Sequence, residues 1–137
     1  MPNRTAAAAA AALAIVVLGA CGSQTATSGT ASVTVNGNDA RIHTVKCSQL
    51  EWYRTIDVGG DLAGVTAVVD ERARPLTAIS VRIKNVGGFT GLYSQGGNGD
   101  ANMSFSGDKY TISGTANGYK TDTNEPASAA FKIITTC

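Results

Sequence analysis

Residues 102–115 of the chain read NMSFSGDKYTISGT, and this stretch decides the fold class. Apolar side chains occupy every second position on each side of its central Gly-Asp pair, with Met103 and Phe105 before the pair and Tyr110 and Ile112 after it. A period of two places alternate side chains on opposite faces of a β-strand, and glycine beside a short polar residue is typical of tight turns. The stretch therefore predicts a β-hairpin with one apolar face.

The same alternation recurs along most of the chain, in residues 32–35, 44–47, 79–84 and 131–137. Turn dipeptides such as Asn36-Gly37 separate these stretches. Short alternating strands with regularly spaced turns favour a two-layer sandwich or a barrel. We therefore predict an all-β fold, in the form of a single small β-sandwich or partial barrel.

Two segments are harder to interpret. Leu50, Trp52, Ile56 and Val58 share one parity, which predicts a strand with Trp52 in the core. The segment 62–72 fits an amphipathic helix with an acidic N-cap residue, but its β-branched residues and internal glycine favour a strand. We expect the strand.

The composition sets limits on the function. The 137 residues are enough for one domain, 43% of them are hydrophobic, and only 15% are charged. The formal net charge is +1, and lysine and arginine form no cluster. The chain therefore lacks the basic surface that nucleic acids or anionic lipid headgroups need, and we expect no nucleic-acid partner.

The N-terminus carries an export signal. Arg4 precedes an uncharged run over residues 6–17, which is too short to span a bilayer and fits the apolar region of a signal peptide. The run leads into Leu18-Gly19-Ala20-Cys21, which resembles the bacterial lipobox. This resemblance implies that residues 1–20 are removed and that Cys21 is acylated. The alternative is an ordinary secretory signal followed by a chance cysteine.

An acylated cysteine would hold the protein at a membrane without basic residues. Each buried methylene contributes ~0.8 kcal/mol, and stable anchoring takes more than one acyl chain. Residues 22–30 read GSQTATSGT and offer nothing to a core. We therefore divide the chain into a signal peptide (1–20), the lipidated cysteine with a flexible tether (21–31), and a β-domain (32–137).

Cys47 and Cys137 are an even pair in an exported chain, where disulfides persist. Cys47 shares its parity with Val45, and Cys137 shares its parity with Phe131, so both sulfurs should face one core. A metal site that joins these thiols to His43 is the alternative, but His43 is the only histidine and zinc needs three or four ligands. We predict a disulfide and neither a metal nor a cofactor.

No set of residues fits a catalytic site. A serine hydrolase needs a base, His43 is the sole candidate, and no serine lies in a G-x-S-x-G turn. Ser106 and Lys109 match the S-x-x-K spacing of penicillin-binding proteins, but they flank a hairpin turn rather than open a helix. The glycine-rich residues 96–100 form one incomplete copy of a calcium-binding repeat. We therefore expect no enzyme activity.

The combined pattern resembles the mycobacterial LpqH-type lipoprotein antigens, the group of the nineteen-kilodalton antigen. The resemblance rests on the lipobox, the Ser/Thr-rich segment after it, and five short motifs. These motifs are VTVNG (33–37), VKC (45–47), NVGG (85–88), YTISGTA (110–116) followed by Gly118, and FKI (131–133) with the C-terminal Thr136-Cys137.

That family implies a membrane-anchored protein on the outer side of the cell membrane, in the cell envelope. It also implies an acylated N-terminus that host lipopeptide-recognising Toll-like receptors detect, and only Cys21 can be carried over for that role. The alternative is a carrier for a lipid or other small apolar ligand held in a cavity of the β-domain.

Overall fold

The computed structural model describes residues 24–72, 74–97 and 99–137, with the side chains of all of these except 24–30 and His43. The predicted signal peptide and Cys21 therefore lie outside the described residues. The described part of the chain forms nine β-strands. They are β1 Gln24–Val35, β2 Asn38–Leu50, β3 Tyr53–Gly59, β4 Gly64–Asp70, β5 Thr77–Val86, β6 Phe89–Ser94, β7 Asp100–Ser106, β8 Lys109–Lys120 and β9 Pro126–Thr136.

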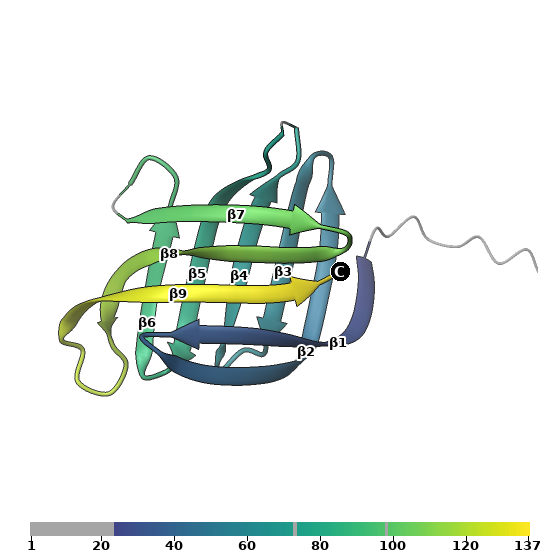
Figure 1. Ribbon diagram of the computed structural model, residues 1–137. Coiled ribbons are helices and arrows are strands. Elements are labelled where there is room, and N and C mark those ends of the chain that lie inside the picture. The colour runs from purple at the N-terminus through teal and green to yellow at the C-terminus, as the bar shows by residue number, and fades with distance from the viewer. Residues whose placement is uncertain (1–23, 73, 98) are drawn as a thin grey trace, which may run out of the picture.

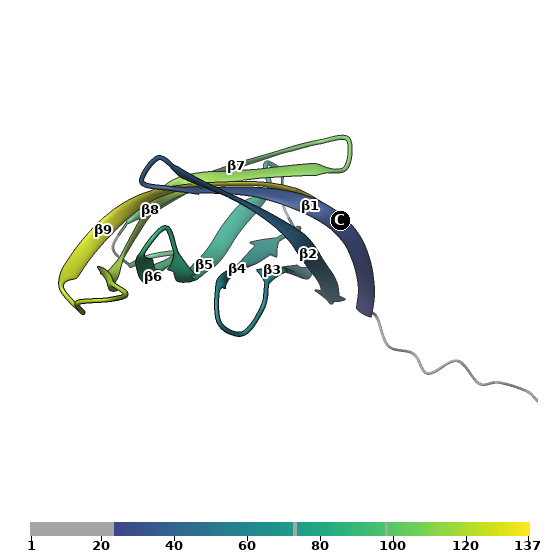
Figure 2. The same cartoon turned by 90° about the horizontal axis from the view of Figure 1, so that it is seen from below.

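The strands form one antiparallel sheet in the order β6-β5-β4-β3-β2-β1-β9-β8-β7, and β6 also pairs with β8. The last pairing closes a ring of strands and leaves β7 as a ribbon on the side of β8. Strands β7, β8, β9 and β1 lie across the front of Figure 1, and β3, β4 and β5 run across them behind. Figure 2 shows these two curved layers from the edge. The fold is a partial barrel, which confirms the all-β prediction.

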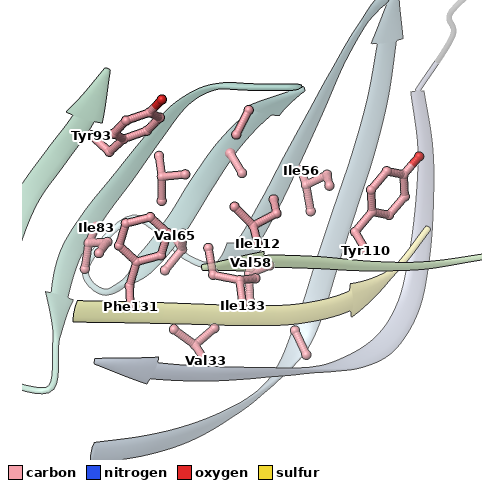
Figure 3. Packing of buried hydrophobic residues seen from close by; sticks show 14 of the residues in the cluster. Val33, Ile56, Val58, Val65, Ile83, Tyr93, Tyr110, Ile112, Phe131 and Ile133 are labelled. Atoms are coloured by element: carbon pink, nitrogen blue, oxygen red, sulfur yellow. The ribbon is translucent and has the colours of Figure 1, made fainter. Parts of the chain in front are cut away.

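Inward-facing residues of both layers form one apolar core (Figure 3). Its fully buried members include Val33, Val35, Ile56, Val81, Ile83, Ile112 and Ile133. Each lies on the inner parity of its strand, as the alternation predicts. Most lysine, arginine and aspartate side chains of the strands lie on the opposite parity and face solvent, so the period of two in the sequence decides which side of the sheet is buried. Arg54 of β3 is an exception, since it shares the parity of the buried Ile56 and Val58.

Several predicted turns and strands are confirmed. Asn36-Gly37 joins β1 to β2 with both residues at positive φ (50° and 79°), as a two-residue hairpin turn requires. Gly107-Asp108 joins β7 to β8, and Gly87-Gly88 joins β5 to β6. The ambiguous segment 62–72 contains β4, so the strand interpretation is correct.

The prediction for Trp52 is wrong. Leu50 pairs with Tyr53, so the chain reverses at Glu51-Trp52, and the expected single strand is two strands joined by this turn. Trp52 is 42% exposed and lies outside the core. Glu51 takes the left-handed conformation (φ 55°) without a glycine, asparagine or proline to announce a turn.

Strand β1 begins at Gln24, earlier than the predicted domain boundary at residue 32. Residues 24–28 pair with β2 from Ser48 to Thr44, and the register shifts between Ser28 and Ala31. Such a shift bends a strand, and beyond it β1 pairs with both β2 and β9. The segment after Gly22 and Ser23 therefore belongs to the sheet, because backbone pairing needs no apolar side chains.

Two glycines in β8 permit the closure of the sheet. Along one edge, β8 pairs with β7 over residues 109–115 and then with β6 over residues 117–120. A Cβ atom at Gly114 would collide with the backbone oxygen of Asp100, and one at Gly118 would collide with the backbone oxygen of Thr90. Neighbouring strands therefore come too close at these two positions for any side chain.

The closure can be tested at Gly118. We expect Gly118→Ala to lower the free energy of unfolding by ~1–3 kcal/mol, because the new methyl group meets backbone that cannot move aside. Gly60→Ala is the matched control, since nothing lies within 4 Å of that position. Urea unfolding followed by circular dichroism measures both. Equal stability of the two variants would contradict the closure shown by the sheet.

Candidate functional site

One end of the barrel gathers residues from distant parts of the chain, and we call it the disulfide end. It consists of Cys47, the segments 50–54 and 70–72, Tyr110 and Cys137. The backbone N–H of Glu71 donates to the carbonyl of Trp52 (2.8 Å), which joins the segment after β4 to the β2–β3 turn. The start of β1 lies at the same end, because Gln24 pairs with Ser48 (Figure 1).

The structure joins Cys47 of β2 to Cys137, the pair that the sequence predicts, with their Cα atoms 5.9 Å apart. Cys47 is buried beside Val45 and Ile56, and Cys137 packs against the same core. The bond ties the last residue of the chain to β2 across a sequence separation of 90 residues. In the chain-entropy account, a loop of this length stabilises the fold by ~4.5 kcal/mol. The pair is a structural disulfide, so neither cysteine offers a free thiolate for catalysis or metal binding.

Next to the disulfide, Glu71 accepts two hydrogen bonds on one carboxylate oxygen. The Arg54 Nε donates at 2.9 Å, and the Tyr110 hydroxyl donates at 3.0 Å. Burial raises the pKa of the Tyr110 phenol, and the hydrogen bond to Glu71 raises it further. A tyrosine that served as a catalytic base would need its pKa lowered. This arrangement therefore keeps the phenol protonated, and its chemistry suits a structural donor.

The outer part of the disulfide end is formed by aromatic rings and an arginine. The guanidinium of Arg72 lies over the ring of Trp52 at 5.2 Å and over the ring of Tyr53 at 5.5 Å. Arg72 also forms an ion pair with Asp70, and its hydrogen bonds lower the pKa of the Asp70 carboxyl. Leu50, at the end of β2, is 75% exposed. The result is a surface of exposed apolar rings and aliphatic groups beside one paired cation.

A polar hollow of about 500 Å³ lies on the outer face of β2, β3, β4 and β5, near the opposite end of the barrel. Three cations (Lys46, Arg82 and Lys84) and two acids (Asp57 and Asp61) contribute to its wall. Asp57 accepts a hydrogen bond from the Thr66 hydroxyl at 2.7 Å. In the described part of the chain, the three cations form no ion pair. The hollow is open and charged, unlike the apolar pocket expected for a lipid carrier.

The other candidate residues do not assemble into a site that the structure describes. Ser106 pairs with Lys109 across the β7–β8 turn, and both side chains are exposed. Cys21 and the side chain of His43 lie outside the described residues. Within residues 24–72, 74–97 and 99–137, no group of three or more histidine, cysteine, aspartate or glutamate side chains is arranged to hold a metal ion. In the same residues, no helix has the length and hydropathy to cross a membrane.

The polar and aromatic parts of the disulfide end were not predicted from the sequence. Glu71 and Arg72 follow directly after β4, and two adjacent charged residues at this place predict only a loop. Their partners Tyr110 and Trp52 are 39 and 20 positions away along the chain. Such contacts depend on which strand ends meet, and a local pattern does not contain that information.

Comparisons with known proteins give one consistent result. The model of the family described as "Mycobacterium 19 kDa lipoprotein antigen" matches residues 24–137. A putative lipoprotein of Mycobacterium indicus pranii is 59% identical over 140 aligned residues, which cover all of both chains. The probable lipoprotein LppE of Mycobacterium tuberculosis is 34% identical and covers 88% of this chain and 87% of its own. The lipoprotein LpqH of the same organism is 32% identical, with 77% of this chain and 67% of its own covered.

The disulfide gives a prediction about stability. We expect the double variant Cys47→Ala/Cys137→Ala to lose ~2–5 kcal/mol of unfolding free energy, because the unfolded chain is no longer constrained. Urea unfolding of the oxidised protein and the variant measures the difference. Reduction of the unmodified protein should produce a loss of similar size. Free thiols at Cys47 and Cys137 in the native protein, detected by alkylation, would contradict the pairing.

Tyr110 gives a prediction about pH. Because its folded pKa is raised above the unfolded value of ~10, its contribution is complete below pH ~10 and is lost as the pH rises through the folded pKa. An ultraviolet titration should therefore show one late-ionising phenol. Tyr110→Phe should remove it and lower stability at neutral pH by ~1 kcal/mol. Tyr119→Phe, at a 40% exposed position, should leave that late transition in place. A late transition that survives Tyr110→Phe would contradict the assignment.

Proposed function

The chain belongs to the Mycobacterium 19 kDa lipoprotein antigen family, and from this membership we propose that it is a cell-envelope lipoprotein held at the membrane by acyl chains on Cys21. The observation that carries the proposal is the sequence Leu18-Gly19-Ala20-Cys21 directly after an uncharged run. Similar proteins that span this whole chain are named as putative lipoproteins. Residues 1–20 would be removed, so that Cys21 becomes the first residue.

The physical chemistry of the domain supports a lipid anchor over other forms of attachment. The formal net charge is +1 with the signal peptide included, and two acids share the polar hollow with its three cations, so the surface has no strong attraction for anionic lipids. Two or three acyl chains on one residue would bury enough methylene groups for stable attachment. The anchor would hold the domain on the outer side of the cell membrane.

We also propose that the domain is not an enzyme and that its lipid is the group through which a host detects it. In the polar network of Arg54, Glu71 and Tyr110, both donors bond to the Glu71 carboxylate, and these bonds hold strand ends together. An acylated N-terminal cysteine is the ligand of lipopeptide-recognising Toll-like receptors, as the family resemblance implies. The receptor would bind the acyl chains and the first residues, and the β-domain would act as an antigen.

The carrier alternative gains no support from the polar hollow. Lysine, arginine and aspartate side chains contribute to its wall, and its volume lies on the outer face of the sheet. A bound lipid tail would need an apolar lining, and the inner faces of the strands instead pack against one another in the core. An apolar ligand stays a prediction, and the polar hollow does not supply its site.

The anchor can be tested with Cys21→Ser. We expect mass spectrometry of the N-terminal peptide from the native protein to show a diacylglyceryl group on Cys21. The acylated protein with the native sequence should partition into a detergent phase. The variant Cys21→Ser should stay in the aqueous phase because it has no acyl chains. The protein should also activate reporter cells that express a lipopeptide-recognising Toll-like receptor, and Cys21→Ser should not.

Ser23→Ala is the matched control, because it changes a neighbouring residue and keeps the lipobox. This variant should partition into detergent and activate the receptor like the protein with the native sequence. An unmodified Cys21 in the mature protein, or receptor activation that survives Cys21→Ser, would contradict the proposal.

A further inference from the structure

The β2–β3 turn exposes large apolar side chains that contribute nothing to the core of the domain. Leu50 is 75% exposed and Trp52 is 42% exposed. The ring centroids of Trp52 and Tyr53 are 6.1 Å apart, and the Arg72 guanidinium lies over both rings. We call these four residues the turn surface. Tryptophan and tyrosine beside a long cationic side chain are typical of proteins at the headgroup level of a membrane.

The register of β1 places the turn surface beside the point where the chain enters the domain. Gln24 pairs with Ser48, and β2 continues beyond Ser48 to Leu50 before the chain reverses. The strands are antiparallel, so the first residues of β1 lie beside the last residues of β2, next to the turn. Figure 2 shows the purple start of β1 beside the arrowhead of β2. Leu50 lies two strand residues beyond Ser48, the partner of Gln24, so the turn projects ~7 Å beyond the start of β1.

The distance from the anchor to the domain is short. Three residue steps separate Cys21 from Gln24, and an extended chain spans at most ~11 Å over that length. The headgroup layer of one leaflet is ~5–8 Å thick. An acylated Cys21 at the membrane surface would therefore hold the start of β1, and with it the β2–β3 turn, at or in the headgroup layer.

The charges at this end do not supply the attraction. Arg72 is paired with Asp70, and Arg54 is paired with Glu71. Glu51 at the turn adds one exposed carboxylate. Because the cations are balanced, contact with lipid would come from the apolar groups of Leu50 and Trp52, so it should not need anionic lipids or low salt.

We propose that the turn surface inserts into the headgroup layer of the membrane that holds Cys21, and so fixes the orientation of the domain. This proposal rests on the acylation of Cys21 proposed above. β3 leads away from the turn and ends at Gly59, so the β3–β4 loop with Asp61 and Leu62 lies at the opposite end. The polar hollow, which this loop borders, then lies near the end of the domain that is farther from the membrane.

Trp52 is the only tryptophan in the chain, so its fluorescence reports on this surface directly. The full mature, acylated protein is reconstituted into phosphatidylcholine vesicles with plain or brominated acyl chains, and bromine quenches only nearby indole rings. We expect Trp52 emission to shift to shorter wavelength and to lose most of its intensity in the brominated vesicles. The loss should be the same at low and high salt.

Leu62 provides the matched control, because it is 86% exposed on the loop at the far end. The variant Trp52→Phe/Leu62→Trp moves the fluorophore there without touching the anchor, and its emission should be the same in plain and brominated vesicles. Cooperative urea unfolding confirms that the variant is folded. Leu50→Ser, with Trp52 kept, should reduce the quenching of Trp52.

Vesicle flotation separates this proposal from the proposed function. Protein that floats with the vesicles while Trp52 stays unquenched overturns the membrane contact and leaves the anchor intact. Equal quenching at both positions also overturns it, because the domain would then have no preferred end at the membrane. A shift of Trp52 emission without quenching would assign the surface to a second copy of the chain instead of lipid. Protein that fails to float overturns the lipid anchor and, with it, this orientation.

Discussion

Strand β8 must serve two partners along one edge, and the architecture depends on that geometry. Its first residues pair with β7 and its last residues pair with β6, while its other edge pairs continuously with β9. Only glycine at Gly114 and Gly118 lets the neighbouring backbones approach closely enough. Once β6 and β8 are joined, the sheet returns on itself and its inner face becomes a core. An open sheet of the same sequence would leave that apolar face in water, at a cost of ~25 cal/mol for each Å².

Closure also decides which parts of the chain meet at the two ends of the barrel. At the disulfide end, the C-terminus, the β2–β3 turn and the segment after β4 are joined by a covalent bond and by the hydrogen bonds of Glu71. The start of β1 lies at this end through its pairing with β2. The opposite end carries the β3–β4 loop and the charged hollow. The two ends therefore differ in chemistry. One end is cross-linked by the disulfide and partly aromatic, and the other is open and polar.

The difference between the two ends matters because only a short segment separates Cys21 from the first strand. A long flexible tether would let the domain rotate freely above a membrane, and its surface chemistry would then matter little to its orientation. Because β1 begins at Gln24, only three residue steps along the chain separate Cys21 from the disulfide end. The balanced charges of Arg54, Glu71, Asp70 and Arg72 leave the apolar groups of the turn to decide how that end meets lipid.

The sequence by itself determined the all-β class, the buried parity of the strands around Val33, Ile83, Ile112 and Ile133, the hairpins at Asn36-Gly37 and Gly107-Asp108, and the pairing of Cys47 with Cys137. These features depend on side-chain period, on residues that accept positive φ, and on parity, all of which are local. Its family motifs also agree with the matched family. Only the tertiary structure decided that Trp52 lies on a turn, that β1 starts at Gln24, and that β8 joins two strands along one edge. The start of β1 and the double pairing of β8 depend on backbone pairing between segments far apart in the sequence, which polar and apolar side chains can share equally, so a one-dimensional pattern carries no signal for them. The turn at Trp52 is local, but it contains no glycine, asparagine or proline, so the sequence gives no turn signal there.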